Sequence, residues 1–159
     1  MRIINRTTGR VLTTALVAGV VAAAIGGVSL ARAGDGGRTL TLTEVQTNAA
    51  FVNISHTPQG APGDQLILRS AVKDAQGRRI GSSSVVCEMV FAKQLQCTGV
   101  YRLPGGTLTG TAMAPASPTS TAPVHIAITG GTGRYEGASG QATLTPQSQT
   151  VNHTVIDLD

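Results

Sequence analysis

The chain has 159 residues with no tryptophan and only four other aromatic residues, two tyrosines and two phenylalanines. So few aromatic rings disfavour a stacking surface for sugars or single-stranded nucleic acid. The three histidines are scattered and show no metal-ligand spacing. The sequence also lacks a Gly-x-Ser-x-Gly nucleophile turn and a paired-cysteine metal motif. We therefore expect neither a metal ion nor a cofactor.

Acidic residues are missing from the first 33 positions, which hold four of the 12 lysines and arginines. Because the whole chain has 8 aspartates and glutamates, the remainder carries equal numbers of basic and acidic residues. The positive net charge of +4 therefore belongs to the N-terminal segment. No basic patch remains to support binding to nucleic acid or to an anionic membrane surface.

The same 33 residues have the pattern of a secretory signal peptide. Three arginines form a basic head, residues 11–30 are apolar or small and uncharged, and Ala31 and Ala33 are the small residues of a cleavage site. An apolar run of about 20 residues could also span a bilayer as an uncleaved anchor. The small-residue site favours cleavage, so we expect a secreted, extracellular protein with no stable membrane insertion afterwards.

Residues 34–159 read as one all-β domain with its core at 39–158. No window shows a sustained helical period of apolar residues. Runs rich in Thr, Val, Ile and Leu, separated by turn signals, predict eight strands at 39–46, 65–73, 79–91, 94–103, 107–113, 124–129, 140–145 and 150–158. Eight short antiparallel strands in one small domain indicate a barrel or a sandwich.

Strand alternation places one carboxylate on an otherwise apolar face. In the first expected strand, Leu40 and Leu42 share a face with Glu44 and Gln46. If the alternation holds, Glu44 points inward and is partly desolvated, as the acids and bases of enzymes often are. The alternative is a strand that ends at Thr43 and leaves Glu44 in water.

A glycine-rich segment lies between the sixth and seventh expected strands. Five of the eleven residues from 130 to 140 are glycine. Such a loop can hold phosphate where a helix follows it, but residues 141–145 alternate like a strand and the lysine of a phosphate-binding loop is missing. A wide turn between two strands is favoured.

Two cysteines, Cys87 and Cys97, lie on the same parity face of a predicted hairpin. Export makes a disulfide possible, and we expect a Cys87–Cys97 bond rather than a free thiol. Placing the two residues opposite each other puts Ala92 at the centre of the turn and implies a loop of three or five residues.

Residues 127–141, AITGGTGRYEGASGQ, resemble the signature of the allene oxide cyclase and dirigent-like barrel proteins. Gly63-Asp64 at the start of a strand, and Ile80-Gly81 shortly before Cys87, agree with that family in order and spacing. The resemblance covers 39–158. It implies an eight-stranded antiparallel β-barrel with an apolar internal cavity and, as in the plant members, a homotrimer.

The resemblance also implies where chemistry would occur. In allene oxide cyclases an inward glutamate on the first strand acts during epoxide opening and ring closure, and Glu44 lies at the similar place. Two water-binding asparagines of those enzymes are replaced here by Gln46 and Ser70. A cysteine near the cavity is matched by Cys87, whereas a tyrosine near the substrate is replaced by Ala114.

Two hypotheses of function follow. One is a cyclase or isomerase that holds a lipophilic substrate in one conformer, with Glu44 stabilising positive charge or moving a proton and with Gln46 and Ser70 positioning a water. The other is a non-catalytic barrel that binds a small hydrophobic ligand. The inward-facing candidates for ligand contact are Leu42, Leu68, Cys87, Met89 and Tyr101.

Cleavage of the signal peptide is expected after Ala33. The basic head, the uncharged apolar run and the small residues at Ala31 and Ala33 are the features that signal peptidase recognises. N-terminal sequencing of the secreted protein should begin at Gly34. Recovery of the full-length chain from membranes would contradict this expectation.

Overall fold

The computed structural model describes residues 37–58, 60–91, 94–117 and 119–159. The expected signal peptide and its cleavage site lie outside these ranges. Within them, no helix has the length and apolar character that crossing a membrane requires.

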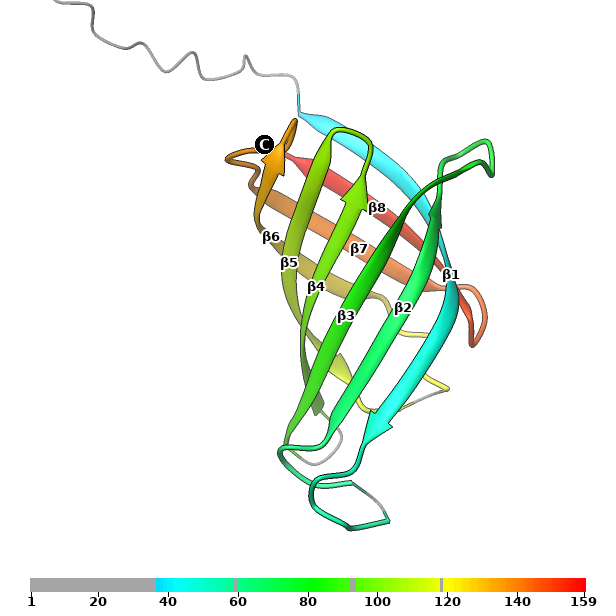
Figure 1. The fold of residues 1–159 in the computed structure, drawn as a ribbon, viewed down its shortest axis with the longest axis vertical. Helices are drawn as coiled ribbons and strands as arrows, with labels where there is room; N and C mark the ends of the chain where they lie inside the picture. The colour runs from blue at the N-terminus through cyan, green and yellow to red at the C-terminus, as the bar shows by residue number, and fades with distance from the viewer. Residues whose placement is uncertain (1–36, 59, 92–93, 118) are drawn as a thin grey trace, which may run out of the picture. The chain divides into compact units, whose positions relative to one another are not determined.

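The described residues form eight antiparallel strands that close into one barrel (Figure 1). Each strand pairs with the next along the chain, and β8 pairs with β1. The predicted all-β barrel is confirmed, and the sandwich alternative is wrong. The strands are β1 (Arg38–Val52), β2 (Gln65–Lys73), β3 (Arg79–Phe91), β4 (Gln94–Leu103), β5 (Gly106–Pro115), β6 (Val124–Gly133), β7 (Gly140–Pro146) and β8 (Val151–Leu158).

The hydrophobic core fills one end of the barrel, where β1 begins and β8 ends. Its buried side chains come from every strand except β3, and Tyr135 joins them from the turn between β6 and β7. Burying such side chains is the main stabilising contribution to a small domain. The core consists of Leu42, Val72, Tyr101, Leu103, Leu108, Ile128, Tyr135, Ala142, Ile156 and Leu158.

The glycine-rich segment builds this filled end. Its first residues continue β6 to Gly133 by pairing with β5, so the wide turn expected after Thr129 starts later than predicted. A Cβ atom at Gly131 would collide with the carbonyl oxygen of Tyr135, whose buried side chain is packed in the core. Gly133 has a φ of 62°, which side-chain-bearing residues rarely adopt. The glycines therefore let the chain fold tightly enough to bring Tyr135 inward.

The predicted Cys87–Cys97 disulfide is present, between residues that lie directly opposite each other on β3 and β4. The predicted turn of three or five residues is wrong. The register shifts between Met89 and Phe91, so that Phe91 pairs with Gln94 across the end of the hairpin. The shift is a β-bulge, which adds one residue to β3. Two residues, rather than three or five, therefore separate Phe91 from Gln94.

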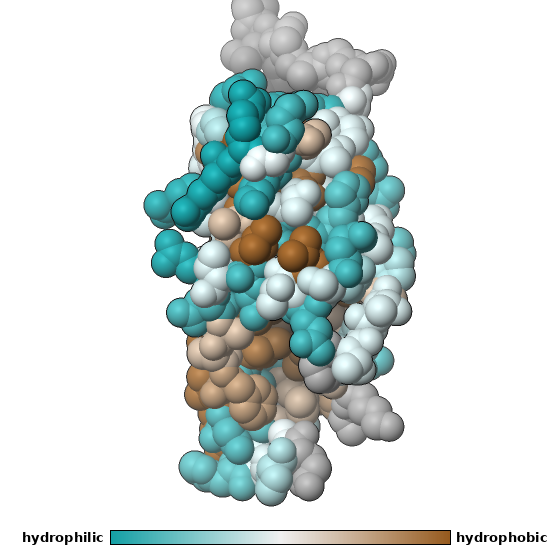
Figure 2. Space-filling model, turned by 90° about the vertical axis from the view of Figure 1, so that its right-hand side faces the viewer, coloured by the Kyte–Doolittle hydropathy of each residue, from teal (hydrophilic) through white to brown (hydrophobic). Residues whose placement is uncertain are grey.

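The outer face of the barrel has both hydrophilic and apolar surface. Figure 2 shows hydrophobic residues gathered in the lower part of the face it presents, whereas the upper part is mostly hydrophilic. A groove of about 500 Å³ crosses β1 to β4, lined by Ala50, Ile67, Val86 and Val100 among others. Ile67, Val86 and Val100 are exposed.

The connection from β1 to β2 is held by a buried carboxylate. Asp64, with 0% of its surface exposed, accepts hydrogen bonds from the Ser55 amide at 2.7 Å, the Ser55 hydroxyl at 2.8 Å and the Ala61 amide at 2.8 Å. Its own backbone pairs with Met89 of β3. The backbone hydrogen bond from Ser55 is the largest influence on the pKa of Asp64, which lies below its ordinary value of 3.8. The charged carboxylate therefore fastens this connection to the barrel.

Asp64→Asn should destabilise the protein at neutral pH. It should also reduce the loss in free energy of unfolding that the wild type shows on acidification. Because the folded-state pKa is lowered, the wild-type contribution is present above the unfolded pKa and is lost as the pH falls through the folded value. Urea unfolding at pH 7 and at pH 3 measures both effects. The control Glu136→Gln removes an exposed carboxylate from another turn. Equal pH profiles for wild type and Asp64→Asn would contradict the assignment.

Candidate functional site

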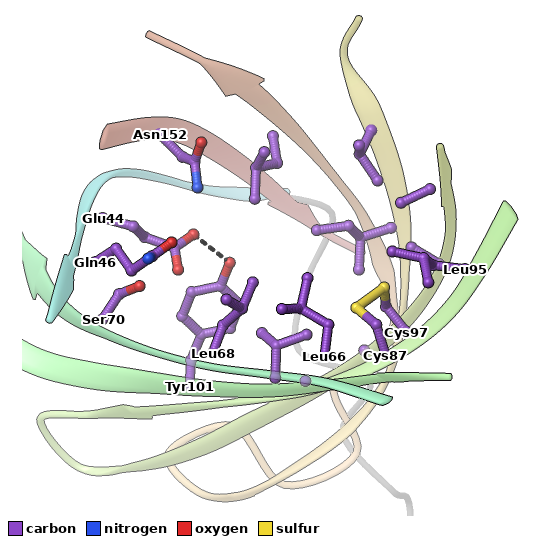
Figure 3. Close-up of a pocket in the computed structure, with 18 of the residues that line it drawn as sticks. Glu44, Gln46, Leu66, Leu68, Ser70, Cys87, Leu95, Cys97, Tyr101 and Asn152 are labelled. Carbon is purple, nitrogen blue, oxygen red and sulfur yellow. Dashed lines mark hydrogen bonds between the residues drawn. A yellow bond between two sulfur atoms is a disulfide. The ribbon is translucent and has the colours of Figure 1, made fainter. Parts of the chain in front are cut away.

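A pocket of about 220 Å³ occupies the barrel beyond the core. Figure 3 shows polar side chains on one side of it and the disulfide with apolar side chains on the other. The lining residues are Glu44, Gln46, Leu66, Leu68, Ser70, Val85, Cys87, Leu95, Cys97, Gly99, Tyr101, Gly110, Ala112, Ala114, Pro115, Val124, Ile126, Leu144 and Asn152.

Glu44 lies at the boundary between the core and the pocket. Because β1 continues to Val52, the alternation holds, and only 3% of the Glu44 surface is exposed. Its Oε1 accepts hydrogen bonds from the Tyr101 hydroxyl at 2.6 Å and the Thr154 hydroxyl at 2.7 Å. Its Oε2 accepts one from the Ser83 hydroxyl at 2.6 Å. The alternative of a solvated Glu44 is therefore wrong.

These four residues come from four strands, β1, β3, β4 and β8. A buried carboxylate is costly unless hydrogen bonds replace its hydration, and three hydroxyl donors do so here. No buried side-chain nitrogen or oxygen in the described residues lacks a hydrogen-bond partner. We name Glu44, Tyr101, Ser83 and Thr154 the hydroxyl–carboxylate cluster.

Tyr101 stays protonated in this environment. Its desolvation is the largest cause that raises its pKa well above the ordinary value of 10.0, and the negative charge of Glu44 adds to the shift. Both causes disfavour a phenolate, since a second negative charge would be buried beside the first. Tyr101 is therefore a fixed hydroxyl donor at the floor of the pocket.

Three more polar side chains border the pocket near Glu44. Gln46 and Ser70 are direct partners in the β1–β2 ladder, and Asn152 is the partner of Glu44 in the β1–β8 ladder. All three line the pocket (Figure 3). The geometry thus brings together the predicted Glu44, Gln46 and Ser70.

The opposite wall is apolar. It consists of Leu66 and Leu68 from β2, Leu95 from β4 and the Cys87–Cys97 bond, among others. Neither sulfur carries a free thiol, because both belong to the disulfide. A ligand in the pocket would meet hydrocarbon and sulfur on one side and the polar floor on the other.

Of the predicted ligand contacts, Leu68, Cys87 and Tyr101 line the pocket. Leu42 belongs to the core beneath it, and the side chain of Met89 lies against Gly60 in the connection between β1 and β2.

Sequence reasoning missed three polar residues of the site: Ser83, Thr154 and Asn152. Strand alternation could have indicated that each of them points inward. Ser83 shares a face with Val85 and Cys87, and Asn152 and Thr154 share a face with Ile156. Their contact with Glu44 could not be inferred, since it depends on which strands meet across the barrel.

The described residues hold no group of three or more His, Cys, Asp or Glu side chains that could bind a metal ion. The donors near Glu44 are hydroxyls and amides, which suit hydrogen bonding to an organic ligand.

Thr154→Val should lower the free energy of unfolding by about 1.5–3 kcal/mol, because it removes a hydroxyl donor from a buried carboxylate while keeping the side-chain shape. Urea unfolding measures the change. Thr41→Val makes the same substitution at an exposed position of β1 and should alter stability by less than about 0.5 kcal/mol. Similar small effects for both variants would show that the Thr154 hydrogen bond contributes little.

Comparisons with known proteins agree with this architecture. A pyocyanin demethylase structure is 22% identical with a TM-score of 0.67, over 77% of this chain and 100% of that chain. The Diels-Alderase AbmU from Streptomyces koyangensis is 19% identical with a TM-score of 0.64, over 76% and 63%. A pterocarpan synthase dirigent protein is 16% identical with a TM-score of 0.56, over 77% and 86%. These likenesses show a shared fold.

Comparison with curated proteins gives no match. The sequence model of the allene oxide cyclase barrel-like domain matches residues 39–156, which include all eight strands except the last residues of β8 and the first of β1. On this match and the closed barrel, the chain belongs to the allene oxide cyclase barrel-like family.

Proposed function

We propose that the protein is a cyclase or isomerase that acts on a small lipophilic molecule held in the barrel pocket. The observation that carries the proposal is the position of Glu44 and Tyr101, a buried hydrogen-bonded pair that borders an otherwise largely apolar pocket. Polar groups that converge in an apolar pocket are the usual mark of a ligand site.

The pocket volume limits the substrate. About 220 Å³ is below the range of roughly 300–1,000 Å³ that drug-sized ligands occupy, and above the roughly 150 Å³ of a cavity that binds benzene. A compact molecule of one or two rings, or a short chain folded toward ring closure, fits this space. Holding such a molecule in one conformer lowers the entropic part of the barrier to an intramolecular reaction.

Glu44 supplies the electrostatic part of the mechanism. Its carboxylate is held by hydroxyls from β3, β4 and β8, so it needs no reorganisation when positive charge develops on a nearby substrate atom. The same oxygen atoms can accept a proton from the substrate. Tyr101 remains protonated beside Glu44, and in this proposal Gln46 and Ser70 hold a water at the edge of the site.

Non-catalytic ligand binding is the second candidate function. The observation in its favour is the disulfide, which leaves no thiol at Cys87, together with Ala114 in place of the tyrosine expected from the family resemblance. Shape and apolar contact would then suffice, and the hydroxyl–carboxylate cluster would serve only to orient the ligand.

We further propose that the protein is exported and assembles as a homotrimer. The Cys87–Cys97 bond supports export, because disulfides persist in oxidising compartments. The apolar groove across β1 to β4 supports assembly, because exposed apolar patches often mark protein contacts.

The test begins with native mass spectrometry of the purified protein, to identify a small molecule that copurifies. Glu44→Gln keeps the side-chain shape and removes the charge, so conversion of that molecule should fall by about a hundredfold or more while binding persists. Glu88→Gln, on the exposed outer face of β3, is the matched control and should retain wild-type turnover.

Unchanged turnover by Glu44→Gln would remove Glu44 from the mechanism. A ligand that binds wild type and is recovered unaltered would favour the binding function instead.

A further inference from the structure

The charge of Glu44 has no cationic partner among the residues that line the pocket. These residues include no lysine, arginine or histidine. The salt bridge found among the described residues joins Arg78 and Asp74, away from this cluster. The hydroxyls of Tyr101, Thr154 and Ser83 are neutral dipoles, so they solvate the carboxylate without cancelling its charge.

Two basic residues that flank inward positions of β2 and β4 point away from the pocket. Arg69 on β2 and Arg102 on β4 have outward parity and are exposed. Their immediate neighbours Ser70 and Tyr101 are buried on the inward face. The Glu44 carboxylate is therefore a negative charge that no positive charge in the pocket lining offsets.

The carboxylate also has acceptor capacity to spare. A carboxylate offers about four lone-pair sites, and the cluster occupies three of them. Oε1 takes two hydrogen bonds, whereas Oε2 takes one, from Ser83. A ligand that carries an N–H donor can use the remaining site.

We propose that the pocket selects ligands with a protonated amine, or another cationic N–H group, on an apolar body of one or two rings, and that it rejects carboxylates of the same shape. The inference rests on the proposed small-molecule pocket and names the chemical class it takes. The cationic end lies against Glu44, and the ring body lies against Leu66, Leu68 and the disulfide. A carboxylate in the same place would be repelled by Glu44 and would lack a donor to share.

Three probes of one shape test the charge preference: naphthylmethylammonium, naphthylmethanol and naphthoate, all substituted at the same ring position. Isothermal titration calorimetry at pH 7 gives their affinities for the wild-type protein. We expect the ammonium compound to bind about tenfold or more tightly than the alcohol, because a charge-assisted hydrogen bond is roughly twice as strong as a neutral one. Naphthoate should bind most weakly.

Two variants locate the source of the preference. Glu44→Gln should bring the ammonium and alcohol affinities to within about threefold of each other, since the charge is gone and the shape is kept. Glu88→Gln removes the same charge from the outer face of β3 and should preserve the wild-type order. If Glu44→Gln does not fold, the wild-type series still decides the charge preference.

Each outcome separates this inference from the proposed function. Equal binding of the ammonium compound and the alcohol, or tighter binding of naphthoate, overturns the charge selection and leaves the pocket as a ligand site. A preference that persists in Glu44→Gln overturns the role given to Glu44. Failure of all three probes to bind overturns this inference, whereas the proposed small-molecule function is tested separately by the copurified molecule and its conversion.

Discussion

The carboxylate of Glu44 is the interaction on which the interior of this barrel depends. It receives hydroxyl hydrogen bonds from Ser83, Tyr101 and Thr154, which lie 39, 57 and 110 residues away in the sequence. A charge withdrawn from water must find such partners or destabilise the fold. The cluster therefore links β1 to β3, β4 and β8 across the interior, in addition to the ladders between neighbouring strands.

The cluster lies between a packed end of the barrel interior and an end that holds the pocket. On one side of Glu44 the interior is packed, with Tyr135 brought inward by the glycine-rich segment. On the other side of Glu44 the interior holds the pocket, and its lining includes small residues such as Ala112 and Ala114. The glycine-rich segment thus contributes to the site indirectly, by stabilising the end that the pocket does not occupy.

Much of this arrangement could be predicted from the sequence, because a strand period of two is local information. Alternation placed Glu44 inside and put Cys87 and Cys97 on one face, and both predictions are confirmed by the structure. The bulge between Met89 and Phe91 could not be predicted, since one extra residue changes the register without a distinctive composition. The partners of Glu44 could not be predicted either, because barrel closure decides which inward residues face each other.

The β3–β4 hairpin connects the disulfide to the chemistry of the floor. Cys87 is opposite Cys97, and on the same ladder Ser83 is opposite Tyr101, with no register shift between the two pairs. A slip of β4 by one residue would turn Tyr101 to the outer face and leave Glu44 with Ser83 and Thr154. The covalent bond at Cys87 fixes the register that presents two of the three donors to Glu44. The disulfide leaves no free thiol in the pocket wall. By fixing the β3–β4 register, it also helps to keep Ser83 and Tyr101 in position to donate hydrogen bonds to the Glu44 carboxylate.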